Sequence, residues 1–121
     1  MMTYTDSQVH DLLPLPTATF HILLAIAKGD KHGYAIIQDV ERRTGGELRL
    51  SAGTLYRSIQ RMLEQGLLRE TRDRPVPELD DERRRYYRIT PFGQAVARAE
   101  AGRMADLVRM ARAQGLVLRK I

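Results

Sequence analysis

The 121-residue sequence contains no cysteine and no tryptophan, and it has only three histidines. Without cysteine there is no disulfide, no thiolate metal ligand and no thiol nucleophile. His10, His21 and His32 are scattered, so a histidine metal cluster is not expected either. The longest apolar stretch, residues 20–27, is interrupted by His21 and is far shorter than the roughly 20 residues that cross a bilayer. The sequence therefore predicts no metal, no cofactor and no membrane span.

Lysine is also scarce, so arginine supplies almost all of the positive charge. The chain has 17 Arg and 3 Lys against 15 Asp and Glu, which leaves a net charge of +5. The planar guanidinium forms paired hydrogen bonds with phosphates and base edges, so a polyanionic partner is expected, although a GC-rich genome also enriches arginine. The surplus is not a basic tail, because residues 28–66 carry +2, 67–88 carry +1 and 89–121 carry +4. Nucleic acid would have to be contacted by arginines at particular positions of a fold.

Two helices are predicted before residue 30. A short one is expected over residues 6–13, where prolines end it. A second is expected over residues 18–28, with Thr17 as its N-cap and Gly29 as its stop. Apolar residues occur on most sides of this second segment, which is typical of a core helix.

The next two predicted helices form the centre of the sequence. One spans residues 33–43, and the next begins at Ser51, its expected N-cap, and ends at Gly66. The helix that begins at Ser51 is amphipathic. Its apolar side carries Leu55, Ile59, Met62 and Leu63, and its opposite side carries Gly53, Thr54, Arg57, Gln60, Arg61 and Glu64. One face is therefore expected to pack, and the other is free to read a partner.

A hairpin is predicted to follow. Residues 67–71 and 85–89 are rich in β-formers, and the long segment between them is polar and contains prolines. Neighbouring strand residues point to opposite faces, so one of Tyr86 and Tyr87 is expected in the core and the other on the surface.

The last predicted helix starts at Thr90 and Pro91, runs to about residue 114, and has two apolar registers. Phe92, Ala95, Val96 and Ala99 are expected to pack on the body of the domain. Further along, a coiled-coil seam is predicted from Ala97, Ala101, Met104, Val108, Ala111, Gly115 and Leu118. A second protomer is the expected partner of this seam, with Val9, Leu12 and Leu13 contributing to the dimer interface. Docking on residues 9–13 of the same chain is the alternative.

The order of helices, hairpin and long helix predicts a mainly α fold with a small β-hairpin, a winged helix-turn-helix with a long C-terminal dimerisation helix. Residues 1–15 are expected to be an N-terminal arm or short helix, 16–90 the DNA-binding domain, and 91–121 the dimerisation helix and tail. The N-terminus lacks a basic region ahead of an apolar core, so no signal peptide is expected and the cytoplasm is the default location.

Four segments resemble, in order, the signatures of the PadR family of winged-helix transcriptional regulators. They are residues 32–34 (HGY), 51–56 (SAGTLY), 63–68 (LEQGLL) and 84–90 (RRYYRIT), and the resemblance covers residues 16–95. It implies a homodimer on a palindromic operator, usually a repressor, with the helix from Ser51 in the major groove, the hairpin as a wing over the minor groove, and the last helix forming the dimer. The single C-terminal helix resembles the short subgroup. The family also implies a small aromatic effector held between the long helices.

The sequence departs from the family pattern in two places. Ala52 and Arg57 stand where members often have proline, so the recognition helix gains a cation. The predicted wing tip carries Glu78, Asp80, Asp81 and Glu82, which repel a phosphate backbone.

The expected DNA contacts lie on the recognition helix, at the start of the preceding helix and in the wing. Arg57 and Arg61 are one turn apart, and each can contact guanine O6 and N7; the alternative is a solvated face paired with Glu64. For the 32–34 segment, the alternative is a turn that uses Gly33 for close packing. The full set of candidates is Ser51, Gly53, Thr54, Tyr56, Arg57, Gln60, Arg61, His32, Tyr34, Arg83, Arg84 and Arg85.

The sequence leads to two hypotheses of function. One is a sequence-specific, homodimeric DNA-binding regulator. The other is a winged-helix module for protein association without specific DNA binding. An enzyme is not expected, because no nucleophile and base at recognisable spacing, no phosphate loop and no metal cluster is found.

Overall fold

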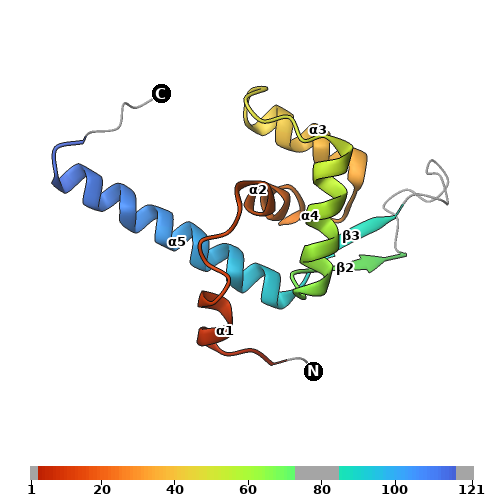
Figure 1. Cartoon of the computed structure of the whole chain (residues 1–121), viewed down its shortest axis with the longest axis horizontal. Helices are drawn as coiled ribbons and strands as arrows, with labels where there is room; N and C mark the ends of the chain where they lie inside the picture. The colour runs from red at the N-terminus through yellow and green to blue at the C-terminus, as the bar shows by residue number, and fades with distance from the viewer. Residues whose placement is uncertain (1–2, 73–84, 117–121) are drawn as a thin grey trace.

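The computed structural model describes residues 3–72 and 85–116, which form five helices and one three-stranded sheet (Figure 1). The elements follow the order α1 (Asp6–His10), α2 (Thr17–Ile26), β1 (Lys31–His32), α3 (Gly33–Arg43), α4 (Ala52–Glu64), β2 (Leu68–Thr71), β3 (Tyr86–Ile89) and α5 (Pro91–Ala113). The predicted fold class is confirmed: the chain is mainly helical, with a small sheet and a long C-terminal helix.

Helix α2 forms the centre of the core, because it contacts α3, α4 and α5. Its large, fully buried side chains are Ile22, Leu23 and Ile26. One side of the helix reaches the surface at Leu24, whose exposed fraction is 40%. The prediction of a core helix is therefore confirmed for most of its circumference.

Two helix boundaries differ from the prediction. Helix α2 begins at Thr17 itself, with Pro16 in the cap position and no side-chain cap, so the predicted Thr17 cap is wrong. Proline fixes its own backbone at an angle compatible with a helix start, and a capping side chain is not required there. Helix α1 ends at His10 after a capping box between Thr5 and Gln8, three residues earlier than predicted.

Helices α3 and α4 form the helix-turn-helix, and side-chain caps start both. The Ser51 hydroxyl accepts a hydrogen bond from the Thr54 amide at 3.1 Å, as predicted. The Nδ1 atom of His32 accepts from the Ala35 amide at 3.2 Å and caps α3, which sequence reasoning missed. The bounds of α3 match the prediction.

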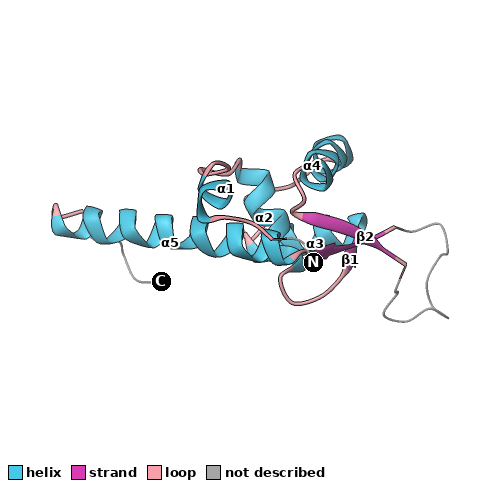
Figure 2. Cartoon of the chain, turned by 90° about the horizontal axis from the view of Figure 1, so that it is seen from below, coloured by secondary structure: helices cyan, strands magenta, loops and turns pink. Residues whose placement is uncertain are grey.

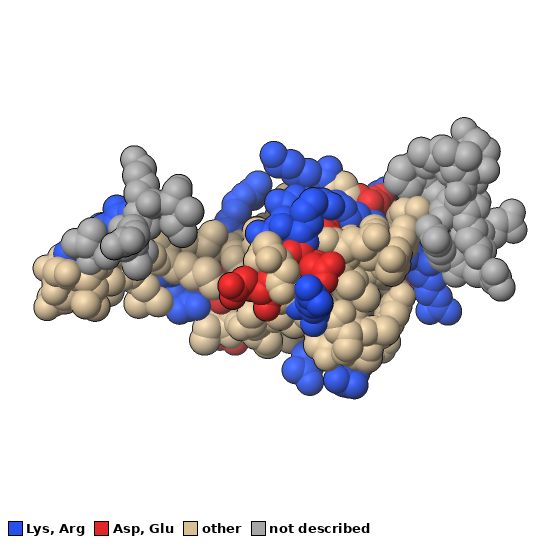
Figure 3. Space-filling view, turned by 90° about the horizontal axis from the view of Figure 1, so that it is seen from above, with Lys and Arg blue, Asp and Glu red and all other residues tan. Residues whose placement is uncertain are grey.

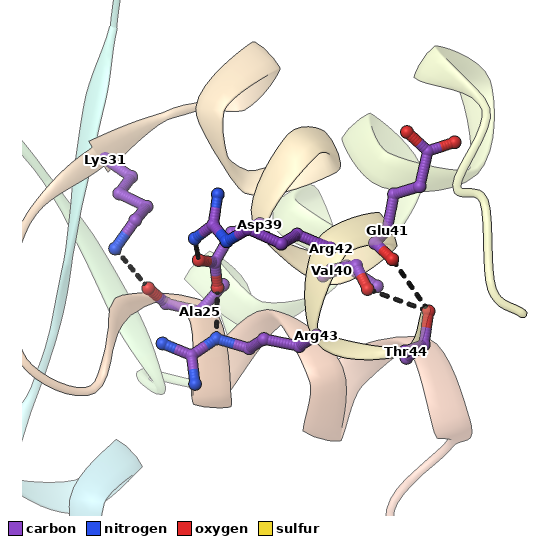
Figure 4. Close-up of polar contacts among 8 residues, drawn as sticks. All are labelled: Ala25, Lys31, Asp39, Val40, Glu41, Arg42, Arg43 and Thr44. Atoms are coloured by element: carbon purple, nitrogen blue, oxygen red, sulfur yellow. Dashed lines mark hydrogen bonds and ion pairs between the residues drawn. The ribbon is translucent and has the colours of Figure 1, made fainter. Parts of the chain in front are cut away.

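The end of α3 is fastened by polar contacts shown in Figure 4. Asp39 is only 2% exposed and accepts hydrogen bonds from Arg42 and from Nε of Arg43, the latter at 2.5 Å. The Thr44 hydroxyl donates to the Val40 carbonyl at 2.9 Å and accepts from the Leu48 amide at 3.0 Å. These contacts fix the connection that leads into α4.

The sheet has three strands rather than the predicted two, in the antiparallel order β1-β3-β2 (Figure 2). Strand β1 has only two residues, Lys31 and His32, which pair with Tyr87 and Tyr86 of β3. Two residues are too few to show a strand pattern, so the sequence predicts no strand here. Tyr86 and Tyr87 are both buried: Tyr87 belongs to the core, and the His32 ring packs edge-on against Tyr86 at 5.3 Å between centroids. The expectation of one surface tyrosine is wrong.

Helix α5 is packed on the body over its first half only. Its buried residues are Gly93, Val96 and Glu100, and Phe92, Ala95 and Ala99 pack beside them as predicted. A Cβ atom at Gly93 would lie 2.2 Å from the Leu67 carbonyl oxygen, so the helix starts in contact with the backbone before β2. The second half projects beyond the other helices (Figure 1). None of the helices in the described ranges is long and apolar enough to cross a membrane.

Candidate nucleic-acid interface

Helix α4 separates an apolar face from a polar one, as the sequence predicts. Leu55, Ile59 and Met62 are at most 2% exposed and pack into the core. The opposite side is exposed and carries Gly53, Tyr56, Arg57, Gln60 and Arg61. Leu63 is half-buried at the border between the two faces. The core thus holds α4 along its length and leaves the candidate reading residues in solvent.

The arginines of this face are free for a partner. Neither Arg57 nor Arg61 forms an ion pair with Glu64 within residues 3–72 and 85–116. The Nη2 atom of Arg57 lies 3.5 Å from the Thr54 hydroxyl, which in turn accepts from the Ser51 hydroxyl at 3.1 Å. The candidates Ser51, Thr54 and Arg57 therefore gather at the N-terminal end of the helix.

Other arginines of the body are engaged with acids. Arg49 pairs with Glu41 at 2.9 Å, and Arg42 and Arg43 share the buried Asp39. Figure 3 shows positive and negative side chains intermixed on the face of the body that it displays. This mixing agrees with the small net charges of residues 28–66 and 67–88.

The start of α3 meets α4 at Gly33. A Cβ atom there would lie 2.3 Å from the Tyr56 hydroxyl, so the close-packing interpretation of Gly33 is confirmed. Tyr34 and Tyr56 are 60% and 51% exposed and border this junction. His32 is half-buried, with its ring used to cap α3 and to pack on Tyr86. The structure thus gives His32 an internal structural role and leaves Tyr34 open to a partner.

The wing is tied to the body by a pair of residues that sequence reasoning missed. Arg88 of β3 donates from Nε to Asp30 Oδ1 at 3.0 Å and from Nη2 to Oδ2 at 2.7 Å. Close by, the Lys31 ammonium donates to the Ala25 carbonyl at 2.6 Å, as Figure 4 shows. Arg88 and Asp30 are 58 positions apart, so no local sequence pattern predicts this pair.

Of the predicted wing arginines, only Arg85 lies within the described residues. It is exposed, and its Nε atom lies 3.4 Å from Glu70 Oε1. Arg83, Arg84 and the acidic residues predicted for the wing tip lie outside the described ranges. Burial, with a smaller contribution from the charge of Glu70, raises the pKa of Tyr87 above its ordinary value of 10.0, so this phenol stays neutral at physiological pH.

The predicted dimer face is corrected in part. Val9 is 5% exposed and belongs to the core of its own chain, where α1 packs on α5, and Leu12, Leu13 and Ala97 pack against the same core. The same-chain alternative therefore holds for Val9, whereas Leu12, Leu13 and Ala97 are only half-buried and their part in a dimer stays a prediction. Ala101 and Met104 are exposed, Val108 and Ala111 are half-buried, and Leu118 lies outside the described ranges.

The second half of α5 carries large apolar side chains that the predicted seam omits. Leu107 and Met110 are 50% and 57% exposed, and the seam residue Met104 is 38% exposed. Leu107 follows Glu100 by seven residues and Val96 by eleven, so at 3.6 residues per turn it lies on the side that packs in the first half. The apolar side of α5 therefore continues from the body into the projecting half.

Glu100 is a functional candidate that the sequence did not reveal. Its side chain is fully buried, its Oε2 atom accepts from the Leu15 amide at 2.8 Å, and its Oε1 atom accepts from Arg103 Nε at 2.5 Å. The bond from Arg103, helped by that from Leu15, holds the pKa of Glu100 below its ordinary value despite burial. The sequence offered one signal for this role: Glu100 is an acid on the side of α5 that is otherwise apolar and packs on the body.

Comparison with known proteins gives a consistent family assignment. Residues 22–99 match the model of the transcriptional regulator PadR-like family. The transcriptional regulator Rv3488 of Mycobacterium tuberculosis is 35% identical over 89 residues, which cover 74% of this chain and 77% of that protein. The chain spans only 65% of a relative from Lysinibacillus sphaericus and 22% of a transposon-encoded protein from Streptomyces fradiae.

Solved structures share the fold. A transcriptional regulator from Clostridium thermocellum, Cth-833, gives a TM-score of 0.67 at 20% identity, covering 92% of this chain and 97% of its own. A PadR family regulator from Clostridium difficile R20291 gives 0.66 at 22% identity, covering 81% and 97%. At these identities the likeness shows the fold alone.

Proposed function

Because the chain belongs to the PadR-like family of transcriptional regulators, we propose that it is a sequence-specific DNA-binding regulator that represses transcription as a homodimer on a palindromic operator in the cytoplasm. The observation that carries this proposal is the α4 face on which Arg57 and Arg61 are exposed and unpaired while the opposite face is held by the core. Residues 16–90 are the DNA-binding domain in this account, and 91–121 are the dimerisation segment.

Helix α4 enters the major groove in this proposal. A guanidinium donates to both O6 and N7 of guanine, a contact worth about 1–3 kcal/mol in discrimination against another base. Arg57 and Arg61 supply two such groups, and Gln60 beside them offers an amide for adenine. The hydroxyls of Ser51 and Thr54 stand at the helix N-terminus, where backbone amides attract a phosphate.

The remaining contacts flank the groove. Tyr34 contacts a backbone phosphate beside α4 in this proposal, which its exposure at the start of α3 supports. Arg83, Arg84 and Arg85 approach the phosphates or the minor groove from the wing. The Asp30–Arg88 pair holds the sheet from which that wing extends.

A second copy of the chain covers the projecting half of α5. Exposed methionine and leucine side chains on one helix side lose area to water when two such helices pack, and each fully buried side chain contributes about 1.5–3 kcal/mol. The two α4 helices of the dimer then meet successive major grooves, about 34 Å apart. The side chains between the paired helices also offer an apolar site for a small aromatic effector, which a thermal-shift screen of planar aromatic acids tests.

Footprinting combined with sedimentation tests the proposal. Protection of two half-sites about one helical turn apart, upstream of the chain's own gene, is the expected result. Leu107→Asp should yield a monomer, whereas Ala105→Asp, which adds the same charge on the other side of α5, should leave the dimer intact. A chain that forms stable protein complexes but protects no DNA at low salt contradicts the proposal in favour of an association module.

A further inference from the structure

The buried carboxylate of Glu100 joins α5 to the connection between α1 and α2. Its Oε2 atom accepts from the Leu15 amide at 2.8 Å across 85 positions of sequence. Leu15 stands between Pro14 and Pro16, and proline has no amide hydrogen. Leu15 therefore supplies the one backbone donor in this three-residue stretch, and α5 uses it.

This link is costly to break. Glu100 is fully buried, and Arg103, 36% exposed, balances its charge through a bond of 2.5 Å. Removing the carboxylate leaves the Leu15 amide without its acceptor, and removing one partner of a buried pair is more damaging than never having the pair. The contact thus holds α5 in one position relative to the body.

The contact also lies at the point where α5 leaves the body. Glu100 is the last buried residue of the helix in the part of the chain that the structure describes, and residues 101–116 are all exposed or half-buried. Figure 1 shows the α1–α2 connection beside α5 at the start of the projecting half. The direction of residues 101–113 is therefore set at this contact.

We propose that Glu100 is a positioning residue that sets the direction of the projecting half of α5 and, through it, the separation of the two α4 helices in the dimer. This inference rests on the homodimer of the proposed function. Thirteen helical residues extend about 20 Å, so a tilt of about 10° at Glu100 moves the far end by about 3.5 Å. That displacement is close to the rise of about 3.4 Å per base pair, so the contact between Glu100 and Leu15 selects the spacing of the two half-sites.

The absence of cysteine makes a direct test possible, because Gln60→Cys on the exposed face of α4 gives one unique labelling site per chain. A nitroxide at this site reports the distance between the two α4 helices by double electron–electron resonance. The label is compared in the otherwise unchanged full chain, in Glu100→Met and in Glu100→Gln. Asp106→Ala is the matched control, because it removes an exposed acid with its own i+3 arginine partner from the same helix.

The unchanged chain and Asp106→Ala should give one narrow distance distribution. Glu100→Met, which fills the space but offers no oxygen to Leu15, should at least double its width or shift its mean by about 3 Å, with the helix content by circular dichroism unchanged. Glu100→Gln, which loses the charged bond to Arg103, should give an intermediate width and decides the matter if Glu100→Met does not fold. A folded Glu100 variant with the distribution of the unchanged chain overturns the inference alone. A monomeric unchanged chain, with no interspin distance, overturns the homodimer as well.

Discussion

The hydroxyl of Tyr56 lies over Gly33 so closely that a Cβ atom on residue 33 would be 2.3 Å from it. The same added Cβ atom would be 3.2 Å from Leu55 Cδ2. Gly33→Ala must therefore displace the ring of Tyr56 from its place over residue 33. We expect the free energy of unfolding to fall by about 1–3 kcal/mol, measured by urea denaturation at a fixed protein concentration.

Two further variants identify the cause of that loss. Gly29→Ala places its new Cβ in open space and should leave the urea midpoint unchanged. Gly33→Ala combined with Tyr56→Ser removes the ring from the overlap, so it should be more stable than the sum of the single changes predicts. Strict additivity would show that the two residues do not contact one another.

Two glycines of α5 give a further prediction, in which the same substitution changes stability in opposite directions. Gly93→Ala brings a Cβ to 2.2 Å from the rigid Leu67 carbonyl and should cost about 1–3 kcal/mol. Gly102→Ala on the same helix meets nothing within 4 Å and should stabilise the chain by about 0.5–1 kcal/mol, since alanine favours the helix. Equal effects of the two changes on the thermal midpoint would contradict the packing of α5 described above.

The lowered pKa of Glu100 predicts how stability depends on acid. A carboxyl group whose pKa is lower in the folded state stabilises the fold above its unfolded pKa, near the ordinary value of 4.5, and loses this contribution as the pH falls through the folded pKa. The stability difference between the unchanged chain and Glu100→Gln should therefore be largest near neutral pH and shrink below about pH 4.5. Denaturant titrations from neutral to acidic pH measure it.

The control for this pH dependence is Asp106→Asn, which removes an exposed acid of α5. An exposed pair contributes little, so its stability difference should stay small at every pH. A difference for Glu100→Gln that does not change with pH would mean that the carboxylate is not held in its charged form by Arg103 and Leu15.

Local signals accounted for the helices that carry the candidate site. The bounds of α3, the Ser51 cap and the two faces of α4 all depend on residues within a few positions of one another, and the sequence predicts them. Strand β1 was missed because two residues carry no periodicity. The predicted Thr17 cap of α2 is wrong, and the His32 cap of α3 was not predicted, because both residues are compatible with more than one local role.

Contacts between distant segments escaped prediction. Asp30 and Arg88 are separated by 58 positions and Leu15 and Glu100 by 85, and neither pair leaves a pattern in its own segment. The apolar character of Val9 is consistent both with a dimer interface, as the sequence analysis expected, and with burial in its own core, where the structure places it. Sequence periodicity predicts that a side chain is buried, but it does not show whether the same chain or a partner chain buries it.

The reading face of α4 is tested most directly by fluorescence anisotropy on duplex DNA from upstream of the chain's own gene. The unchanged chain should bind with nanomolar affinity at low salt, more tightly than it binds a scrambled duplex. Arg57→Ala removes one base contact in each half-site, and at about 1–3 kcal/mol per contact it should weaken specific binding by at least about thirtyfold. Arg98→Ala, which removes an exposed arginine from α5, should bind like the unchanged chain. Absence of specific binding at low salt, or equal affinities for Arg57→Ala and the unchanged chain, would contradict the account.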